Sequence, residues 1–382
     1  MNSEFLEIKS NDSNICEFGE CGGAVTSLLK YLLEEEIVDD VLTIQKQDSV
    51  YEGLPTLISN PEDLVKTAGS LHCVPTMTAD LISRFLSGKK IATVGKPCDT
   101  MAIDELKKRN QIDEDKIYTI GLNCGGTVLP ETAQKMFQLF YEVDPSKVVK
   151  EEIEKGKIII ELEDGTEKGI KIDDLEEEGY GRRGNCQRCE VMIPRNADIA
   201  CGNWGASDGW TFVEIITPKG KELVENAISK GFIQSKSPSE KQMEMRSKVE
   251  NIMIKGAKKS KQNQLEGEYP SLEDWDKYWH RCIGCYGCRD VCPICWCKEC
   301  EIEKMNPESA DSYPQDPLMF QGIRLGHMSY SCVNCGQCED VCPMEIPLSR
   351  IYDKLQKKYR EKTGYIPGFG EDLPPLFSPE DI

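Results

Sequence analysis

The sequence predicts a mixed-sheet α/β domain followed by a smaller, mostly helical domain. Short apolar runs alternate with helical patterns between residues 41 and 122, a rhythm typical of layered α/β structure with parallel strands. Two runs of regularly spaced cysteines follow between residues 282 and 342, and the helical pattern Pro317–Met328 lies between them. A chain of 382 residues is long enough for two or three domains.

The first domain is expected to alternate helices and strands. The expected elements are a helix after the glycine turn Gly22–Gly23, a strand at Val41–Ile44, a capped helix at Pro61–Thr67, an amphipathic helix at Thr78–Ser87, a strand at Ile91–Val94, a helix at Thr100–Arg109, a strand at Ile117–Leu122 and an acidic β-hairpin over Val148–Ile172 that turns at Asp164–Gly165. The sequence contains no G-x-G-x-x-G motif, so the domain lacks a Rossmann fingerprint. The turn Gly22–Gly23 could cradle a phosphate at a helix N-terminus, and a bare turn is the alternative.

The cysteine runs give the clearest chemical signal in the chain. Each run reads C-x2-C-x2-C-x3-C-P, the ligand pattern of a bacterial-type ferredoxin with two [4Fe–4S] clusters. The first three cysteines of a run can reach one cubane, whereas the fourth faces the other cluster. We therefore assign Cys282, Cys285, Cys288 and Cys342 to one cluster, and Cys332, Cys335, Cys338 and Cys292 to the other.

Composition weighs against zinc and against disulfides. Zinc sites usually include histidine, and the whole chain has only His72, His280 and His327. Disulfide frameworks suit small secreted domains, whereas the nineteen cysteines here lie in a long chain without an export signal, which indicates a reducing cytoplasm. The net charge of −20 argues against nucleic acid, and no run of about 18 apolar residues could span a membrane.

Further cysteines lie outside the ferredoxin pattern. Cys186 and Cys189 form a C-x2-C pair, and Cys98 and Cys124 follow predicted strands, where open α/β sheets bind ligands. These four could bind a third [4Fe–4S] cluster or zinc, or could be unligated thiols. Cys295, Cys297 and Cys300 exceed the ligand count; we expect them to be inert, with a further metal as the alternative.

The chain is expected to divide into four parts. These are an α/β domain over residues 1–235, a polar linker over 236–270 with a surface helix at Met243–Ile254, a two-cluster ferredoxin domain over 271–355, and a tail rich in proline and acidic residues over 356–382. The tail is expected either to be disordered or to lie as an arm on a partner subunit.

Several separated stretches together resemble the F420-reducing hydrogenase beta-subunit family. They are, in order, GGAVTSLLKYLLEEEIVDDVL, TAGSLHCVP, KKIATVGKPCDTMAID, IYTIGLNCGG, CQRC and ADIACGNWGASDGWTFVEIITPKGKE. The match covers about residues 15 to 235, and its specificity comes from the order and spacing of the motifs. The C-terminal ferredoxin pattern CIGCYGCRDVCPICWCKEC is similar to that of the formate-oxidising branch of this family.

The resemblance implies a site for FAD and for the deazaflavin coenzyme F420. It assigns Cys98, Cys124, Cys186 and Cys189 to a third [4Fe–4S] cluster near FAD. The residues it implies for cofactor binding are Gly22, Gly23, Thr26, Gly69, Ser70, Gly95, Lys96, Arg183, Asn203, Trp204 and Gly205. The chain departs from the family pattern at Lys96, where a small residue is usual, and at Asn203, where an acidic residue is common. No role is assigned to Cys16, Cys21, Cys73 or Cys201.

The resemblance also implies a direction for the chemistry. A partner catalytic subunit with molybdenum or tungsten bis-pterin would oxidise formate, and electrons would pass through the clusters to FAD and leave as hydride to F420. No catalytic side chain is assigned here. A larger electron-bifurcating assembly with heterodisulfide reductase is a further implied partner. The alternatives are the same module serving a hydrogenase or another oxidoreductase, and a non-enzymatic electron-transfer subunit.

The anionic tail of F420 would require a local basic patch on a chain of net charge −20. The nearest candidates in sequence are Lys96, Arg182, Arg183 and Arg188. The alternative is that these side chains are solvated loop charges.

Overall fold

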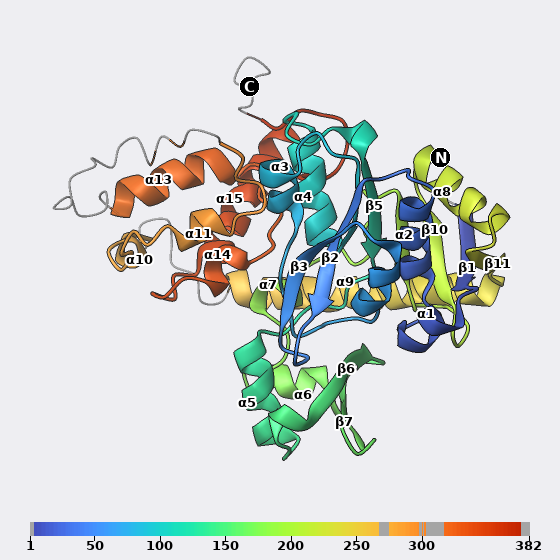
Figure 1. Cartoon of the computed structure of the whole chain (residues 1–382). Helices are drawn as coiled ribbons and strands as arrows, with labels where there is room; N and C mark the ends of the chain where they lie inside the picture. Colours follow the sequence, from blue (N-terminus) through green and yellow to red (C-terminus); the bar gives the residue numbers. More distant parts are fainter. Residues whose placement is uncertain (1–3, 267–274, 298–299, 301, 303–316, 376–382) are drawn as a thin grey trace.

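An eight-stranded sheet forms the centre of the protein (Figure 1). The computed structural model describes residues 4–266, 275–297, 300, 302 and 317–375. The strands, in spatial order, are β11 (Ile233–Lys236), β1 (Glu4–Ser10), β10 (Thr211–Ile215), β9 (Ile199–Gly202), β5 (Ile117–Leu122), β4 (Ile91–Gly95), β2 (Asp40–Lys46) and β3 (Gly53–Ile58).

The sheet is mixed, as the sequence predicts. Strands β2, β4, β5 and β9 pair in parallel, and antiparallel strands flank them on both sides. Gly95 is in register with Gly121, and Leu122 is in register with Cys201. The loops that follow β4, β5 and β9 therefore leave the sheet side by side at the carboxyl ends of these strands, where open α/β sheets bind ligands. This end of the parallel strands is called the edge of the large sheet below.

Two groups of helices cover the two faces of the sheet. Helix α2 (Ala24–Glu34) and helix α8 (Pro218–Ser229) pack through Leu28 and Val224 against Ile120 and Val213 of the sheet. Burying a side chain such as Leu28 stabilises the fold by about 1.5–3 kcal/mol. The other face is covered by α3 (Ala79–Phe85), α4 (Pro97–Lys107) and the C-terminal domain, which share one core.

Most of the expected elements form, with small shifts at their ends. The predicted strands Val41–Ile44, Ile91–Val94 and Ile117–Leu122 correspond to β2, β4 and β5, and the predicted helix Pro61–Thr67 is the 3-10 helix η1 with the same bounds. The predicted helix Thr100–Arg109 begins earlier, because Pro97 occupies its first turn and Asp99 accepts a hydrogen bond from the Lys96 amide at 3.1 Å. The remaining short elements of the α/β part are α1 (Ser13–Phe18), η2 (Glu114–Lys116) and α7 (Gly184–Gln187).

The acidic region after residue 148 differs from the predicted hairpin. It forms a three-stranded antiparallel sheet of β6 (Val148–Glu154), β7 (Lys157–Leu162) and β8 (Glu167–Lys171), packed with α5 (Pro130–Phe140), η3 (Pro145–Lys147) and α6 (Ile172–Glu177). The predicted turn at Asp164–Gly165 is present. A second turn at Gly156, whose φ of 75° favours glycine, adds the third strand.

The expected polar linker is mainly one helix. Helix α9 (Glu240–Glu266) runs for 27 residues and contains the predicted surface helix Met243–Ile254. It lies along the α/β domain (Figure 1) and is held there by Arg246, which forms a buried ion pair with Glu214 at 3.2 Å, and by the buried Ala257. The lysine-rich composition that suggested a linker is the composition of the exposed face of this helix.

The C-terminal domain is helical in its described residues, as predicted. Its helices are α10 (Trp275–Trp279), α11 (Gly287–Asp290), α13 (Pro317–Met328), α14 (Gln337–Asp340) and α15 (Leu348–Thr363). The predicted helix Pro317–Met328 is α13 with the same bounds. Among the described residues, no helix has both the length and the apolar character that crossing a membrane requires.

The expected tail 356–382 is ordered over much of its length. Residues 356–363 belong to α15, and the segment after Gly364 folds back onto α4 of the same chain. Lys108 donates a hydrogen bond to the Phe369 carbonyl at 2.9 Å, so the described part of this segment packs on its own chain. Residues 376–382 lie outside the described residues.

Candidate functional site

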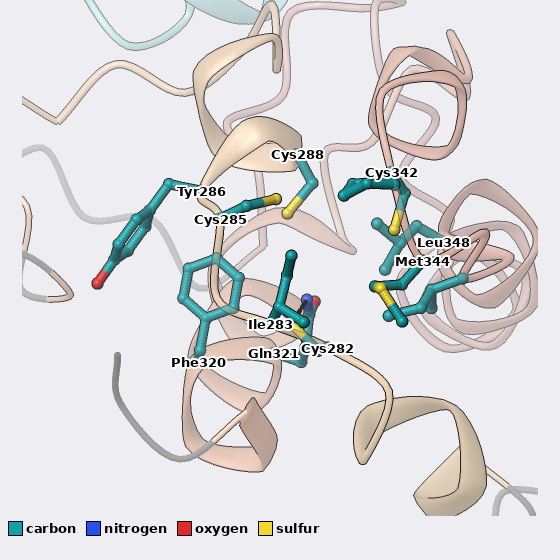
Figure 2. Close-up of a pocket in the computed structure, with 12 residues that line it drawn as sticks. Cys282, Ile283, Cys285, Tyr286, Cys288, Phe320, Gln321, Cys342, Met344 and Leu348 are labelled. Carbon is teal, nitrogen blue, oxygen red and sulfur yellow. Dashed lines mark hydrogen bonds between the residues drawn. The ribbon is translucent and has the colours of Figure 1, made fainter. Parts of the chain in front are cut away.

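The first cavity of the C-terminal domain is lined by cysteines from both runs. Cys282, Cys285 and Cys288 come from the loop before α11 and from α11 itself, and Cys342 comes from the turn after α14. Figure 2 shows their side chains around one space, next to Phe320 and Gln321 of α13. The cavity measures about 300 Å³, including the part that opens to solvent. These four residues are the first ligand set that the sequence predicts.

A second cavity is lined by the other predicted set. Cys332, Cys335 and Cys338 come from the loop before α14 and from α14 itself, and Cys292 comes from the turn after α11. This cavity measures about 410 Å³, and the Asn334 amide donates a hydrogen bond to the Cys332 sulfur at 3.4 Å. The fourth cysteine of each run thus lies in the turn after its short helix and lines the cavity of the other run. This is the exchange of fourth ligands that the spacing predicts.

The inner cysteines gather at the edge of the large sheet. Cys98 lies in the first turn of α4, Cys124 follows β5, and Cys186 and Cys189 lie in and just after α7. Burial raises the pKa of Cys124 to about 11, with Cys186 contributing, and raises the pKa of Cys189 to about 12, with Cys186 and Cys124 contributing. Burial raises the pKa of Cys98 as well, and Cys124 and Cys335 are among its charged neighbours. A Cβ at Gly126 would lie 3.2 Å from the Cys186 Cβ, so Cys186 lies beside the loop of Cys124, and the neighbouring Asn185 contacts the Cys335 carbonyl at the second cavity.

The donor set fits iron–sulfur chemistry. The Gly126 amide donates to the Cys124 sulfur at 3.3 Å, and hydrogen bonds of this kind tune the potential of a cluster. Thiols buried in this way ionise when a metal binds them. In the described ranges, no three His, Cys, Asp or Glu side chains lie close enough together to hold a single metal ion.

The surplus cysteines line neither cavity. Cys295 is partly buried beside Cys292, and the Cys295 carbonyl accepts a hydrogen bond from Arg84 at 3.4 Å. Cys297 is exposed, and residues 298, 299 and 301 around Cys300 lie outside the described residues. Cys201 is buried within β9, and Cys73 is buried beside Glu151, so neither lies with a cysteine set.

The two glycine turns implied in flavin binding are neighbours. Gly22 and Gly23 have φ of 72° and 68°, and Gly23 is the N-cap of α2. A Cβ at Gly22 would lie 2.3 Å from the Gly209 carbonyl oxygen, so close packing already requires a glycine there. Thr26 is buried in the first turn of α2, and the Ser70 amide next to Gly69 donates to Glu20 at 3.2 Å. The structure therefore brings residues 20–26 and 69–70 together.

The other implied cofactor residues follow the parallel strands. Gly95 ends β4 and is followed by Lys96, and Asn203, Trp204 and Gly205 follow β9 at the same edge of the sheet. A Cβ at Gly205 would lie 2.3 Å from the Gln242 carbonyl oxygen, so the loop packs closely on α9. Both loops thus leave the sheet beside Cys124.

Asn123 is a residue that the sequence analysis did not single out. It stands directly after β5, and both polar atoms of its side-chain amide are buried without a hydrogen-bond partner among the residues that the structure describes. A Cβ at Gly202 would lie 2.4 Å from the Asn123 Nδ2, so the amide sits between the ends of β5 and β9. Buried polar groups are almost always hydrogen-bonded, so an orphaned amide here fits a polar ligand at this edge. The sequence did carry one indication of this role: Asn123 lies between the end of a predicted strand, Leu122, and the candidate ligand Cys124.

The four basic candidates for the F420 tail do not form a free basic patch. Each pairs with a carboxylate of this chain: Lys96 with Asp99 at 3.1 Å, Arg182 with Glu176 at 2.6 Å, Arg183 with Asp340, and Arg188 with Asp353 at 3.5 Å. Burial lowers the pKa of Lys96, but Asp99 and Cys98 outweigh it and raise that pKa above its ordinary value. Neither the predicted patch nor the alternative of solvated charges describes these side chains, because the acidic chain supplies a partner for each.

Arg183 differs most from its predicted place. Its guanidinium is buried, donates to the Cys335 carbonyl at 3.0 Å and pairs with Asp340 of α14. Asn185 donates to the same carbonyl at 2.6 Å. The residues before Cys186 therefore fix the C-terminal domain against the edge of the large sheet.

The fold and the cysteine sets define an iron–sulfur subunit with an α/β cofactor domain. Family models named "Coenzyme F420 hydrogenase/dehydrogenase, beta subunit", for its N-terminal and C-terminal parts, match residues 5–83 and 88–241, and a "4Fe-4S dicluster domain" matches residues 278–346. The chain belongs to this beta-subunit family of oxidoreductases, which confirms the predicted resemblance, the predicted enzyme class and the ferredoxin-type domain.

Two relatives match over nearly the whole chain. F420-dependent formate dehydrogenase subunit beta of Methanocaldococcus jannaschii is 59% identical over 99% of this chain and 100% of its own length. F420-dependent formate dehydrogenase 1 subunit beta of Methanococcus maripaludis is 53% identical over 98% of both. A chain of the F420-reducing [NiFe] hydrogenase complex from Methanosarcina barkeri shares the fold, with a TM-score of 0.60 and 23% identity over 69% of this chain and 92% of that chain.

Proposed function

We propose that this chain is the electron-outlet subunit of an F420-dependent formate dehydrogenase. In this proposal a partner subunit with molybdenum or tungsten bis-pterin oxidises formate, and this subunit passes the electrons to F420. The observation that carries the proposal is the identity of 59% to a subunit of that name over its full length. Its ferredoxin domain is included in that match, whereas the hydrogenase beta subunit of Methanococcus voltae covers only 61% of this chain.

We assign three [4Fe–4S] clusters to the three cysteine sets. The outer cluster belongs to the first cavity, the middle cluster to the second cavity, and the inner cluster to Cys98, Cys124, Cys186 and Cys189. The contacts of Arg183 and Asn185 with Cys335 support this order, because they join the loop of the inner set to the middle set. Cys285 and Ile283 are exposed beside the first cavity, so the outer set is the one that a partner subunit can approach.

We place FAD at the edge of the large sheet beside the inner set. The glycine turns Gly22–Gly23 and Gly69–Ser70, the loops after β4 and β9, and the orphaned amide of Asn123 would hold it. A flavin converts between single electrons from clusters and the hydride that a deazaflavin accepts. Arg183 forms an ion pair with Asp340 and is therefore not among the residues that hold FAD in this proposal. Lys96, which binds Asp99 and the Thr76 carbonyl, shapes the loop in this proposal.

The decisive experiment is anaerobic purification of the chain with its partner subunit. We expect about twelve irons and one flavin per chain, from three clusters of four irons and one FAD. The complex should reduce F420 with formate, and the isolated chain should reduce F420 with an artificial electron donor. A preparation without flavin, or one that is inactive toward F420 with every donor, would instead favour the electron-transfer subunit without F420 chemistry. Copurification of a nickel–iron subunit would favour the hydrogenase alternative.

A further inference from the structure

Asn185 fills the space between the second and the inner cysteine sets. Its side-chain amide donates to the Cys335 carbonyl at 2.6 Å and lies 3.8 Å from the sulfur of Cys186, the next residue. A Cβ at Gly336 would lie 2.3 Å from Asn185, and the φ of 79° at Gly336 also favours glycine. Any side chain larger than that of glycine at position 336 would therefore collide with Asn185.

Arg183 holds this contact from the other side. It donates to the same Cys335 carbonyl at 3.0 Å, and its backbone amide donates to the Thr127 carbonyl at 2.9 Å. The Thr127 hydroxyl lies 3.6 Å from the Cys186 sulfur. The ion pair with Asp340 keeps the guanidinium in place, and only 6% of Arg183 is exposed. The carbonyl of the predicted ligand Cys335 is thus held by two side chains that closely precede the predicted ligand Cys186 in the sequence.

We propose that the Asn185 side chain is the bridge for electron transfer between the middle and the inner cluster, with Arg183 as its positioning residue. The path runs from Cys335 through one hydrogen bond to Asn185 and on to Cys186. Electron tunnelling weakens less steeply along bonds and hydrogen bonds than through empty space, so this contact gives a connected route between the two sets. One electron leaves the middle cluster, which is oxidised, and enters the inner cluster, which is reduced; no bond or proton changes place.

The proposal rests on the three-cluster assignment above, and its test separates the two. The substitution Asn185→Leu keeps the approximate volume but removes the donor, and Asn185→Asp keeps the shape but replaces the donor with a carboxylate. Gln337→Leu is the matched control, because the Gln337 side-chain amide also donates a hydrogen bond across the same interface, but to the Pro75 carbonyl and not to the Cys335 carbonyl. The wild-type complex and the three variants are prepared anaerobically with the partner subunit.

The measurement is the rate at which the inner cluster is reduced after mixing with formate, followed by freeze-quench EPR. We expect a several-fold slower rate in both Asn185 variants and an unchanged rate in Gln337→Leu, with the iron content at the wild-type level in all. Wild-type rates in Asn185→Leu with full iron would overturn the bridge and leave the proposed function intact. Loss of iron from Asn185→Leu together with a wild-type rate in Asn185→Asp would also overturn it, since Asn185 would then be structural. Iron too low for three clusters in the wild type would refute the cluster assignment instead.

A redox titration tests the role of Arg183. It measures the midpoint potential of the inner cluster, which a purely structural role of Arg183 would not change. The Arg183 guanidinium donates to the Thr127 hydroxyl at 3.5 Å, and this hydroxyl lies 3.6 Å from the Cys186 sulfur, so the positive charge would stabilise a reduced, more negative inner cluster. Arg183→Gln should therefore shift the midpoint potential of the inner cluster to a more negative value. Arg183→Lys, which keeps the positive charge, should have a potential close to that of the wild type. An unchanged potential in Arg183→Gln with full iron content would contradict this role.

Discussion

The carboxylate of Glu105, in the last turns of α4, accepts a hydrogen bond from the hydroxyl of Tyr365. Glu105 is fully buried and also accepts from the Gly368 amide at 2.8 Å and from Arg109 at 3.0 Å. Arg109 in turn donates to Ser331, the residue before Cys332. One buried carboxylate thus connects the C-terminal segment, the α/β domain and the loop of the second cysteine set.

We predict that Glu105→Ala destabilises the protein severely. It would remove a buried carboxylate that forms ion pairs with Arg109 at 3.0 Å and with Lys108 at 3.5 Å, and breaking such buried pairs costs about 3–5 kcal/mol. Tyr365→Phe removes one hydrogen bond and should cost only about 1 kcal/mol. Anaerobic thermal unfolding measures both, and the exposed Glu114→Gln is the control. Equal unfolding temperatures for Glu105→Ala and the control would show that this network does not hold the two domains.

Removal of an inner cysteine should remove one cluster and leave two. Cys98→Ala and Cys186→Ala should each lower the iron content by about four per chain, because a cubane with three protein ligands is held weakly at this edge. Cys16→Ser, outside all three sets, serves as the control and should keep its iron. The measurement is iron per chain after anaerobic purification, and full iron in Cys98→Ala would remove the inner cluster from the proposal.

The surplus cysteines should be dispensable for metal binding. Replacing Cys295, Cys297 and Cys300 together by serine should leave the iron content unchanged, because these residues line neither cavity. Iron analysis and the EPR spectra of the reduced clusters check this. Loss of iron or of one cluster signal would mean that these thiols bind metal after all.

The pair Glu20 and Glu152 should make stability depend on pH. Burial, together with the hydrogen bond and charge of Glu152, raises the pKa of Glu20 to about 7, against smaller opposing effects of Lys150 and His72. The folded protein keeps a proton that the unfolded chain, with a pKa near 4.5, releases. The stabilisation from this retained proton is fully present below pH 4.5 and is lost as the pH rises toward 7.

The opposite shift of Glu152, whose pKa is lowered chiefly by its hydrogen bond with Glu20, matters only as the pH falls below the ordinary range of that group. Between about pH 5 and pH 7, the wild type should therefore lose on the order of 1–2 kcal/mol relative to Glu20→Gln. Unfolding temperatures over this range test it, with the exposed Glu163→Gln as the control. Parallel pH profiles for the wild type and Glu20→Gln would contradict the prediction.

The sequence predicted the elements whose signals are local. Val41–Ile44, Ile91–Val94 and Ile117–Leu122 are buried central strands, so their apolar runs stand out, and Pro317–Met328 has a helical period. Strands β1 and β9–β11 escaped detection because their place in the sheet comes from pairing with strands that are distant in the sequence, which no local pattern shows. Helix α9 was interpreted mainly as a linker because only part of its narrow inner face is apolar.

Local spacing by itself determined the prediction of the eight ferredoxin cysteines and their grouping, because three ligands of each cubane lie at fixed intervals along one short loop and the fourth follows the other loop at a fixed interval. Only the tertiary structure decided how the distant residues meet: that Asn185, next to Cys186, contacts the Cys335 loop, that Arg183 and Arg188 pair with carboxylates of the C-terminal domain, and that the amide of Asn123 has no hydrogen-bond partner among the described residues. The physical reason is that charge pairing and burial depend on separation in space, which the fold sets and which the distance along the chain does not encode.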